Sequence, residues 1–394
     1  MTRWRFLAAF MLVLAAPPPQ PAAAQAACKA PEAVCDQAGR VFRISSFDPV
    51  ASAVLIEPGL LVTNRHAIAN NQRAQVFLPS GSQGGGQVLA DVVPTSYPGD
   101  LILLRAPGLK DAPGLKETGP VATAKAGAGE PLYAIGADVG RGAIRVYKPG
   151  RQVLAPAPGK PLARLHHDAF SQPGNSGGAL VNAKGQLVAV IASGGEGRNE
   201  AIPASEIAKL KAASGPDHRI ASMATGEAYR KCSEALDAAR AARRELKPKH
   251  VSFIKDQCVA TNNRQLWDLA GQVFGRQRLF DDAVSMFARA LDQDPNALNS
   301  LVSMAITLHL AGRYADEVKP LKRLVDILPA DAEVLRLGVQ AGTWGGDKAL
   351  AEKSLKLLQQ HHPRLAPLAR DFIEKNPTPP RRRPSSPPRA PRER

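Results

Sequence analysis

Gly174-Asn175-Ser176-Gly177-Gly178 is the most informative stretch of this 394-residue sequence. Glycine has no Cβ, so it adopts positive φ angles and allows another segment to approach its backbone closely. A serine between glycines can therefore present its hydroxyl group, while the N–H groups of Gly174 and Ser176 point at one reacting oxygen as an oxyanion hole. Taken alone, the pentapeptide is also compatible with an ordinary surface turn.

Two upstream segments carry the partners that a serine nucleophile requires. His66 lies near the end of the apolar run 60–68, and Asp100 opens the apolar run 101–104. A serine hydroxyl is a weak nucleophile, so a base such as imidazole must take its proton and a carboxylate must orient that imidazole. The order His66, Asp100, Ser176 is that of chymotrypsin, and differs from those of subtilisin and the α/β-hydrolases.

Other residues of the same types fit less well. The adjacent histidines at positions 166 and 167 lie only ten and nine residues before Ser176, on a segment that reads as a strand. The aspartates at positions 91 and 111 open no comparable apolar run. The pattern therefore favours Ser176 as the nucleophile, His66 as the base and Asp100 as the orienting carboxylate.

Residues 38–212 resemble the trypsin-like (chymotrypsin-fold) serine peptidases, and are most similar to the bacterial branch that includes the HtrA/Deg-type proteases. The resemblance rests on segments 61–68, 100–104 and 168–180 and on the spacing of the three residues along the chain. It implies an all-β double six-stranded barrel for a peptidase domain at residues 27–214. It also implies a catalytic triad of His66, Asp100 and Ser176, with Gly174 and Ser176 as oxyanion donors.

Two residues next to the serine depart from the zymogen-type digestive proteases. Asn175 stands where those enzymes carry an aspartate that pairs with a freshly cut amino terminus, an ion pair that asparagine cannot form. We therefore expect other contacts to order this loop. Pro173 restricts the preceding residue to extended geometry and removes one N–H donor, so it stiffens the loop in either an active or a resting shape.

The resemblance also locates the primary specificity pocket, in the segment before the serine and in the strand 191–195. No acidic residue occurs at these positions, so a preference for Lys or Arg is not predicted. A modest apolar pocket is expected, although Phe170 can equally belong to the core. The pocket residues we expect are Phe170, Ser171, Gln172, Ser193 and Gly194.

The first 26 residues have the pattern of a secretory signal peptide. Basic residues at 1–5 precede an apolar run at 6–16 and a small-residue stretch with cleavage positions near Ala24 or Ala26. The apolar run is too short for a permanent bilayer span. A lipid-anchored form acylated at Cys28 is the weaker alternative. We expect a periplasmic or secreted bacterial protein.

Because an exported protein enters an oxidising compartment, its four cysteines are expected to form disulfides. Four cysteines allow three pairings. Closeness along the chain favours Cys28 with Cys35 and Cys232 with Cys258, each bridge closing a local loop in an oxidising compartment. No C-x-x-C spacing or histidine cluster accompanies them. We therefore predict no metal site, and no cofactor is expected.

After residue 214 the pattern changes to Ala, Leu, Arg and Glu at helical spacing. Helices are expected at about 224–246 and 251–258, within a helical linker at 215–263. From about residue 265 a 34-residue period is visible in Pro295, Pro329 and Pro363. Residues 264–365 resemble two good tetratricopeptide repeats and one weak one, in which Gly342 replaces the usual aromatic. The alternative is a plain helical bundle. An all-α helical-repeat domain is predicted.

The chain carries 51 Lys and Arg against 35 Asp and Glu, a net charge of +16. Part of the excess lies in the Pro- and Arg-rich tail 376–394, which has almost no apolar residue to bury and is expected to be disordered. Weak contact of this tail with anionic surfaces is compatible with its charge. No nucleic-acid reading motif accompanies it, so specific nucleic-acid binding is not predicted.

Together these patterns predict an exported serine endopeptidase whose repeats recruit a protein or peptide substrate, or a partner protein. The alternative from another class is a non-catalytic binding protein that uses the peptidase fold and the repeats as interaction modules. A second alternative is a self-limited protease that cleaves its own segment 212–247.

Overall fold

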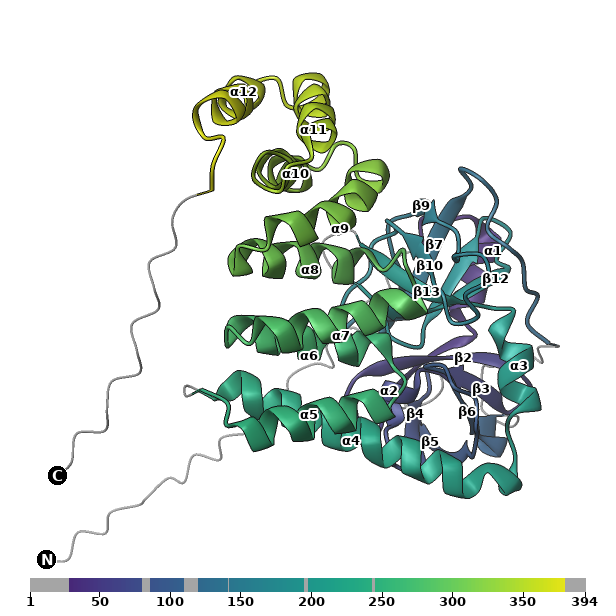
Figure 1. Cartoon of the computed structure of the whole chain (residues 1–394). Coiled ribbons are helices and arrows are strands. Elements are labelled where there is room, and N and C mark those ends of the chain that lie inside the picture. The colour runs from purple at the N-terminus through teal and green to yellow at the C-terminus, as the bar shows by residue number, and fades with distance from the viewer. Residues whose placement is uncertain are drawn as a thin grey trace, which may run out of the picture.

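The computed structural model describes residues 28–79, 86–109, 120–140, 142–194, 198–242 and 245–379. The expected signal peptide and residues 380–394 of the expected tail lie outside these ranges. The described chain has a β-rich half followed by an α-rich half, which lie against each other (Figure 1). Within the described ranges, none of the helices combines the length and the apolar character needed to span a bilayer.

The first barrel is a closed, antiparallel ring of six strands. Its order is β1-β2-β3-β6-β5-β4, and β1 pairs with β4 to close it. Buried apolar side chains such as Phe42, Ile44 and Leu61 fill the interior. The strands are β1 (Val41–Ser45), β2 (Ala51–Glu57), β3 (Leu60–Thr63), β4 (Arg73–Phe77), β5 (Gln87–Val93) and β6 (Ile102–Arg105).

The second barrel closes through the pairing of β11 with β7, and β8 adds to β7 outside the ring. Leu132, Leu165 and Leu180 are buried inside it. Its strands are β7 (Pro131–Ala137), β8 (Ile144–Val146), β9 (Gly150–Leu154), β10 (Leu165–His167), β11 (Ala179–Asn182), β12 (Leu187–Ser193) and β13 (Asn199–Pro203). The predicted pair of six-stranded barrels, the chymotrypsin fold, is confirmed.

Among the described residues, three short helices accompany the barrels, together with two 3₁₀ turns at Pro107–Leu109 and Pro216–His218. The helices are α1 (Glu32–Ala38), α2 (Arg65–Ile68) and α3 (Glu206–Ala212). His66 lies on α2 directly after β3, Asp100 lies shortly before β6, and Ser176 lies in the loop before β11. Strand ends from both barrels thus carry the candidate residues.

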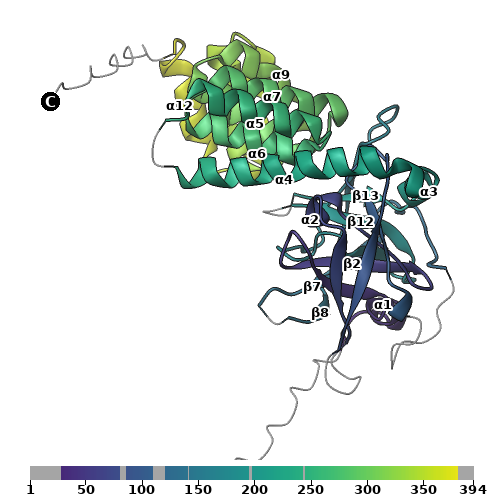
Figure 2. The same ribbon diagram turned by 90° about the horizontal axis from the view of Figure 1, so that it is seen from below.

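The α-rich half is a stack of consecutive helix pairs (Figure 1). In the view of Figure 2, the long helix α4 runs along the border between the two halves. The helices are α4 (Arg219–Ala241), α5 (Pro248–Ala260), α6 (Arg264–Arg276), α7 (Phe280–Gln293), α8 (Leu298–Ala311), α9 (Tyr314–Ile327), α10 (Ala332–Trp344), α11 (Lys348–His361) and α12 (Ala366–Lys375).

Helix α4 differs in extent from the helix expected at 224–246. It begins earlier, after a 3₁₀ turn that Pro216 opens, and it ends at Ala241. Helix α5 begins earlier than expected as well, because Pro248 occupies its first turn, where no N–H partner is needed. The apolar core that α4 and α5 share with α6 and α7 extends to Ala69 and Phe47 of the first barrel. This segment therefore packs on both halves.

The structure contains both disulfides that chain proximity favoured, Cys28–Cys35 and Cys232–Cys258. The second bridge joins α4 to α5. In the weak third repeat, a Cβ on Gly342 would lie 2.5 Å from the Ala351 nitrogen, so the glycine allows α10 and α11 to approach closely. The helix pairs are compatible with tetratricopeptide repeats, and that assignment stays a prediction.

Candidate active site

His66 and Asp100 form a close pair. Asp100 Oδ2 lies 2.8 Å from His66 Nδ1, and Asp100 Oδ1 accepts a hydrogen bond from the His66 backbone N–H at 3.0 Å. The backbone carbonyl of Asp100 accepts from the Asn64 side chain at 3.0 Å. Asn64 directly precedes α2, so the segment around the histidine is bonded to the aspartate at three atoms. This leaves His66 Nε2 as the nitrogen free to act as a base.

The two charges of this pair support each other. Burial lowers the pKa of His66, but the Asp100 carboxylate more than offsets this effect, so that the pKa is raised overall. Burial raises the pKa of Asp100, and His66 together with the Arg164 guanidinium reverses that effect and lowers it. Asp100 is therefore ionised over the physiological range and stabilises an imidazolium when one forms.

Ser176 lies between two tight turns that depend on glycine. The Gln172 carbonyl accepts from the Asn175 N–H at 3.1 Å across Pro173 and Gly174, and Gly174 has φ +92° in the manner of a type II turn. The next turn bonds the Asn175 carbonyl to the Gly178 N–H at 2.8 Å, with Gly177 at φ +83°. These positive φ values explain the two glycines that flank the serine.

The serine hydroxyl has its own partner in this structure. Ser176 Oγ donates to the Ala192 carbonyl at 3.3 Å, and within the described residues no hydrogen bond joins it to His66. Within the same residues, neither Gly174 nor Ser176 uses its backbone N–H in a bond to a protein acceptor. The structure thus pairs His66 with Asp100, whereas it bonds the Ser176 hydroxyl to the Ala192 carbonyl instead.

Asn175 supplies the contacts that order this loop. Its side chain is fully buried; Nδ2 donates to the Ala137 carbonyl at 3.0 Å and to the Tyr147 hydroxyl at 3.2 Å. Its Oδ1 accepts from the Gln172 N–H at 2.9 Å. A neutral amide can serve as donor and acceptor at once, so the loop is ordered without an ion pair.

Ser52 of β2 is a structural partner of the loop that the sequence patterns did not identify. Its Oγ donates to the Gly174 carbonyl at 2.7 Å and accepts from the Ala137 N–H at 2.9 Å. Its backbone N–H donates to the Ser176 carbonyl at 2.8 Å. The sequence offered one signal for this role: Ser52 is a hydroxyl residue inside the otherwise apolar stretch 51–56. Ser52 therefore joins the first barrel to the loop 171–178 of the second, which carries Ser176.

The expected pocket residues divide into two groups. Phe170 is 50% exposed and packs its ring against Tyr147 at 5.6 Å, so the alternative that it belongs to the core is wrong. Gln172 Nε2 donates to the same tyrosine at 3.0 Å. Ser171 Oγ lies 3.4 Å from Asn175 Oδ1. Ser171 and Gln172 open the loop 171–178, and Phe170 directly precedes it.

Ser193 and Gly194 lie at the end of β12. Ser193 Oγ donates to the Glu200 carboxylate at 2.8 Å, which turns this hydroxyl to a buried ion network. A Cβ on Gly194 would lie 2.0 Å from Asn199 Oδ1, so only glycine fits there. Their part in a specificity pocket stays a prediction.

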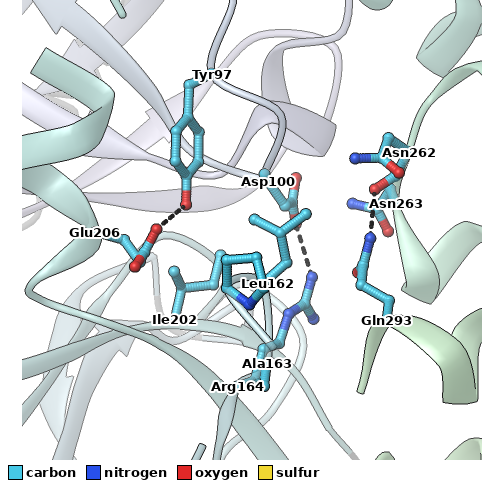
Figure 3. A pocket seen from close by; sticks show the side chains of 12 residues that line it. Tyr97, Asp100, Leu162, Ala163, Arg164, Ile202, Glu206, Asn262, Asn263 and Gln293 are labelled. Carbon is cyan, nitrogen blue, oxygen red and sulfur yellow. Dashed lines mark hydrogen bonds and ion pairs between the residues drawn. The ribbon is translucent and has the colours of Figure 1, made fainter. Parts of the chain in front are cut away.

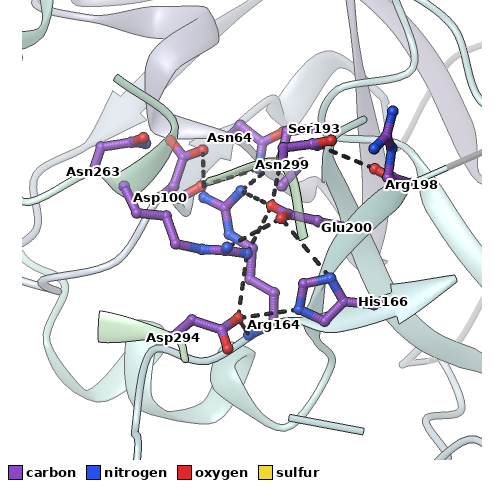
Figure 4. Close-up of polar contacts among 12 residues, drawn as sticks. Asn64, Asp100, Arg164, His166, Ser193, Arg198, Glu200, Asn263, Asp294 and Asn299 are labelled. Atoms are coloured by element: carbon purple, nitrogen blue, oxygen red, sulfur yellow. Dashed lines mark hydrogen bonds and ion pairs between the residues drawn. The ribbon is translucent and has the colours of Figure 1, made fainter. Parts of the chain in front are cut away.

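The ion network joins the barrels to the helices, and we call it the barrel–helix junction. It comprises Arg164, His166, Glu200, Arg264 and Asp294, all of them buried. Figure 4 labels Arg164, His166, Glu200 and Asp294. Arg264 of α6 binds Glu200 of β13 with both terminal nitrogens, at 3.0 and 2.7 Å. Asp294 accepts from the Arg164 backbone N–H at 3.1 Å and lies 3.2 Å from His166 Nε2. Two arginines and two carboxylates balance each other's charge.

The junction reaches the candidate triad through Arg164. Its Nη1 donates to Ser193 Oγ at 2.9 Å, and its Nη2 lies 3.6 Å from Asp100 Oδ2. Asp100 and Arg164 also line a small pocket together with Asn263, which Figure 3 shows from close by. That pocket has room for about one water molecule, so we assign no ligand to it. Among the described residues, no group of three His, Cys, Asp or Glu side chains could hold a metal ion.

Residues 51–190 match the family model described as "Trypsin-like peptidase domain". The matched range covers strands of both barrels and includes all three candidate triad residues. The chain thus contains a trypsin-like peptidase domain.

Similar curated proteins are serine proteases. The serine protease Do-like HtrA of Lactobacillus helveticus is 29% identical over 167 residues, 39% of this chain and 38% of that protein. The serine protease HTR4 of Bos taurus is 32% identical over 151 residues, 36% of this chain and 30% of that protein. The chain thus spans well under half the length of these relatives.

The chain is also similar to solved structures of proteases. The inactive form of the Rv3671c protease has 22% identity and a TM-score of 0.37, covering 47% of this chain and 97% of that one. The HtrA-type protease AlgW with a tripeptide has 26% identity and a TM-score of 0.38, covering 46% of this chain and 61% of that one.

Proposed function

We propose that this chain, which contains a trypsin-like peptidase domain, is a serine endopeptidase that cleaves peptide bonds through His66, Asp100 and Ser176. The observation that carries the proposal is the pairing of His66 Nδ1 with the buried Asp100 carboxylate at 2.8 Å. That bond fixes the imidazole tautomer with Nε2 as the base. The flanking glycine turns and the similarity to HtrA-type serine proteases support the same conclusion.

The reaction begins when Ser176 Oγ leaves the Ala192 carbonyl and transfers its proton to His66 Nε2 as it attacks the scissile carbonyl. The N–H groups of Gly174 and Ser176 stabilise the oxyanion. Asp100 stabilises the imidazolium, which then protonates the departing amine. Water, deprotonated by His66, hydrolyses the acyl-enzyme and restores the serine.

The helical repeats are proposed to recruit the protein substrate or a partner protein. Stacked helix pairs present extended surfaces of the kind that bind peptides and proteins. We also propose that the protein is exported. The leader pattern at residues 1–26 supports export, and so do the two disulfides, which persist in oxidising compartments.

Cleavage of an unbiased peptide library, read by mass spectrometry, tests the peptidase proposal. The full chain should cleave, and Ser176→Ala should not. Ser205→Ala is the matched control: this serine is exposed, and its side chain makes no capping bond at the start of α3. Equal cleavage by Ser176→Ala and the unmodified chain would exclude Ser176 as the nucleophile.

The same variants address self-cleavage of the segment 212–247. Helix α4 occupies residues 219–241 of that segment, and a helix does not offer the extended backbone that peptidases bind. We therefore expect the intact mass of the unmodified chain to remain equal to that of Ser176→Ala, apart from the substitution.

A further inference from the structure

Asp100 receives a contact from outside both barrels. The Tyr229 hydroxyl on α4 lies 3.4 Å from Asp100 Oδ1, the oxygen that also accepts the His66 backbone N–H. Tyr229 is only 1% exposed, so water does not compete for its hydroxyl. Among the described residues, the charged and titratable groups that interact with Asp100 are Arg65 and His66 on α2, Tyr97 in the segment before β6, Arg164 before β10 and Tyr229 on α4.

Asn263 determines which way the tyrosine donates. It caps α6, and its Oδ1 accepts from the Leu266 N–H at 3.1 Å. The amide is therefore oriented with Nδ2 towards Tyr229, 3.0 Å from the phenolic oxygen. A phenol that accepts from Asn263 has its single proton left for Asp100. Burial and the Asp100 charge raise the pKa of Tyr229 well above its usual value, so the phenol remains a donor.

Helix α4 is fastened close to the segment that carries His66. A Cβ on Gly226 would lie 2.5 Å from the Ala69 carbonyl oxygen, so this glycine permits the close approach. Arg65, next to His66, donates to the Ser222 hydroxyl on α4 at 3.0 Å. Both contacts lie on the turns of α4 that directly precede Tyr229, so they fix the part of the helix from which the tyrosine follows.

We propose that Tyr229 is a positioning residue for the catalytic carboxylate: its hydroxyl, oriented by Asn263, donates to Asp100 Oδ1 and makes the helical half part of the peptidase site. The catalytic consequence rests on the proposed function, whereas the contact itself does not. Without the phenol, Asp100 carries more uncompensated charge towards His66 and is less firmly oriented. The pKa of His66 should then rise, and acylation of Ser176 should slow.

The first experiment is an NMR titration of isotope-labelled histidines in full chains that all carry Ser176→Ala, so that turnover plays no part. The His66 signal is identified by its loss in His66→Gln. Tyr229→Phe should raise the pKa of His66 by about half a unit. Asn263→Ser, which keeps a good capping residue on α6, should raise it in the same direction. Tyr314→Phe is the matched control, because that tyrosine lies on α9, where its ring packs against Trp344 at 4.8 Å, and its loss should leave the pKa of His66 unchanged.

The second experiment measures the rate at which a fluorophosphonate labels Ser176 at pH 7, in chains that retain this serine. Tyr229→Phe should slow labelling by about 3- to 10-fold, as expected for one lost hydrogen bond. An unchanged or lowered pKa of His66 in both Tyr229→Phe and Asn263→Ser would overturn the positioning role. A raised pKa with no labelling of the unmodified chain would retain the contact and overturn the peptidase proposal instead.

Discussion

The nucleophile loop, residues 171–178, and the barrel–helix junction serve the same candidate site through different kinds of contact. In the loop, two successive turns close over four residues each, and glycine supplies the positive φ that they need. In the junction, Glu200 binds Arg264 from 64 positions away, and His166 meets Asp294 from 128 positions away. The loop therefore depends on local backbone geometry, and the junction depends on how the two halves pack.

The largest effect should come from removing the base that the nucleophile loop is proposed to work with. His66→Gln should lower turnover of a cleaved library peptide by about 10⁶-fold if the triad acts as one unit. His250→Gln, at an exposed histidine on α5, should leave turnover unchanged. Initial rates with the same peptide provide the measurement. A loss of less than about 100-fold in His66→Gln would mean that another group acts as the base.

The junction can be broken without touching the loop. Arg264→Met leaves Glu200 buried without its two-bond partner and should lower the free energy of unfolding by about 3–5 kcal/mol. Adding Glu200→Gln removes the unpaired charge and should restore part of that loss. In Arg73→Met, where the paired Asp91 is exposed, the change should stay below about 1 kcal/mol. Denaturant unfolding measures all three, and equal losses in Arg264→Met and Arg73→Met would refute a buried, coupled junction.

The sequence predicted the features that depend on local backbone geometry, and it did not predict the contacts that depend on how the two halves pack. The loop could be predicted because its two turns need positive φ angles at Gly174 and Gly177, and the glycines are visible in the sequence. The helix pairs could be predicted from the 34-residue period, because each pair must bury the same kind of apolar face against its neighbours. Nothing near Tyr229 or Arg264 in the chain indicates that one will face Asp100 and the other Glu200. These contacts depend on the docking of α4 and α6 on the barrels.

Two adjacent histidines differ in the same way: His166 belongs to the barrel–helix junction, and His167 does not. His166 lies 3.2 Å from Asp294, whereas burial, with a smaller contribution from the neighbouring His166, lowers the pKa of His167 to about 4. The unfolded chain then binds more protons than the folded one between pH 4 and 6.5, so the contribution of His167 to stability is lost as the pH falls through that window. The loss should reach about 3 kcal/mol.

The measurement is the free energy of unfolding of the unmodified chain relative to His167→Gln at pH 7 and pH 4.5. This difference isolates the histidine from Asp268, whose pKa burial raises to about 6 and whose contribution has the opposite sign. A difference that does not change with pH would show that His167 titrates normally in the folded chain.

The smallest expected effect is a difference in stability between alanine substitutions at two helical glycines. Gly226→Ala places a methyl group against the Ala69 carbonyl and should destabilise the fold by about 1–3 kcal/mol. Gly275→Ala, on α6, meets only Thr307 Oγ1 at an ordinary 3.4 Å and should stabilise it by up to about 1 kcal/mol, because alanine favours helix. Thermal unfolding of the two variants measures the contrast. Stabilisation by both would mean that α4 does not approach α2 closely.

The most direct test of the central claim is the mass of the full chain after reaction with a fluorophosphonate, followed by peptide mapping. One adduct on Ser176, absent in Ser176→Ala and strongly slowed in His66→Gln, is the predicted result. A chain that circular dichroism shows to be folded and that carries no adduct at Ser176 would contradict it. In that case the double barrel and the helical repeats would be interaction modules without peptidase chemistry.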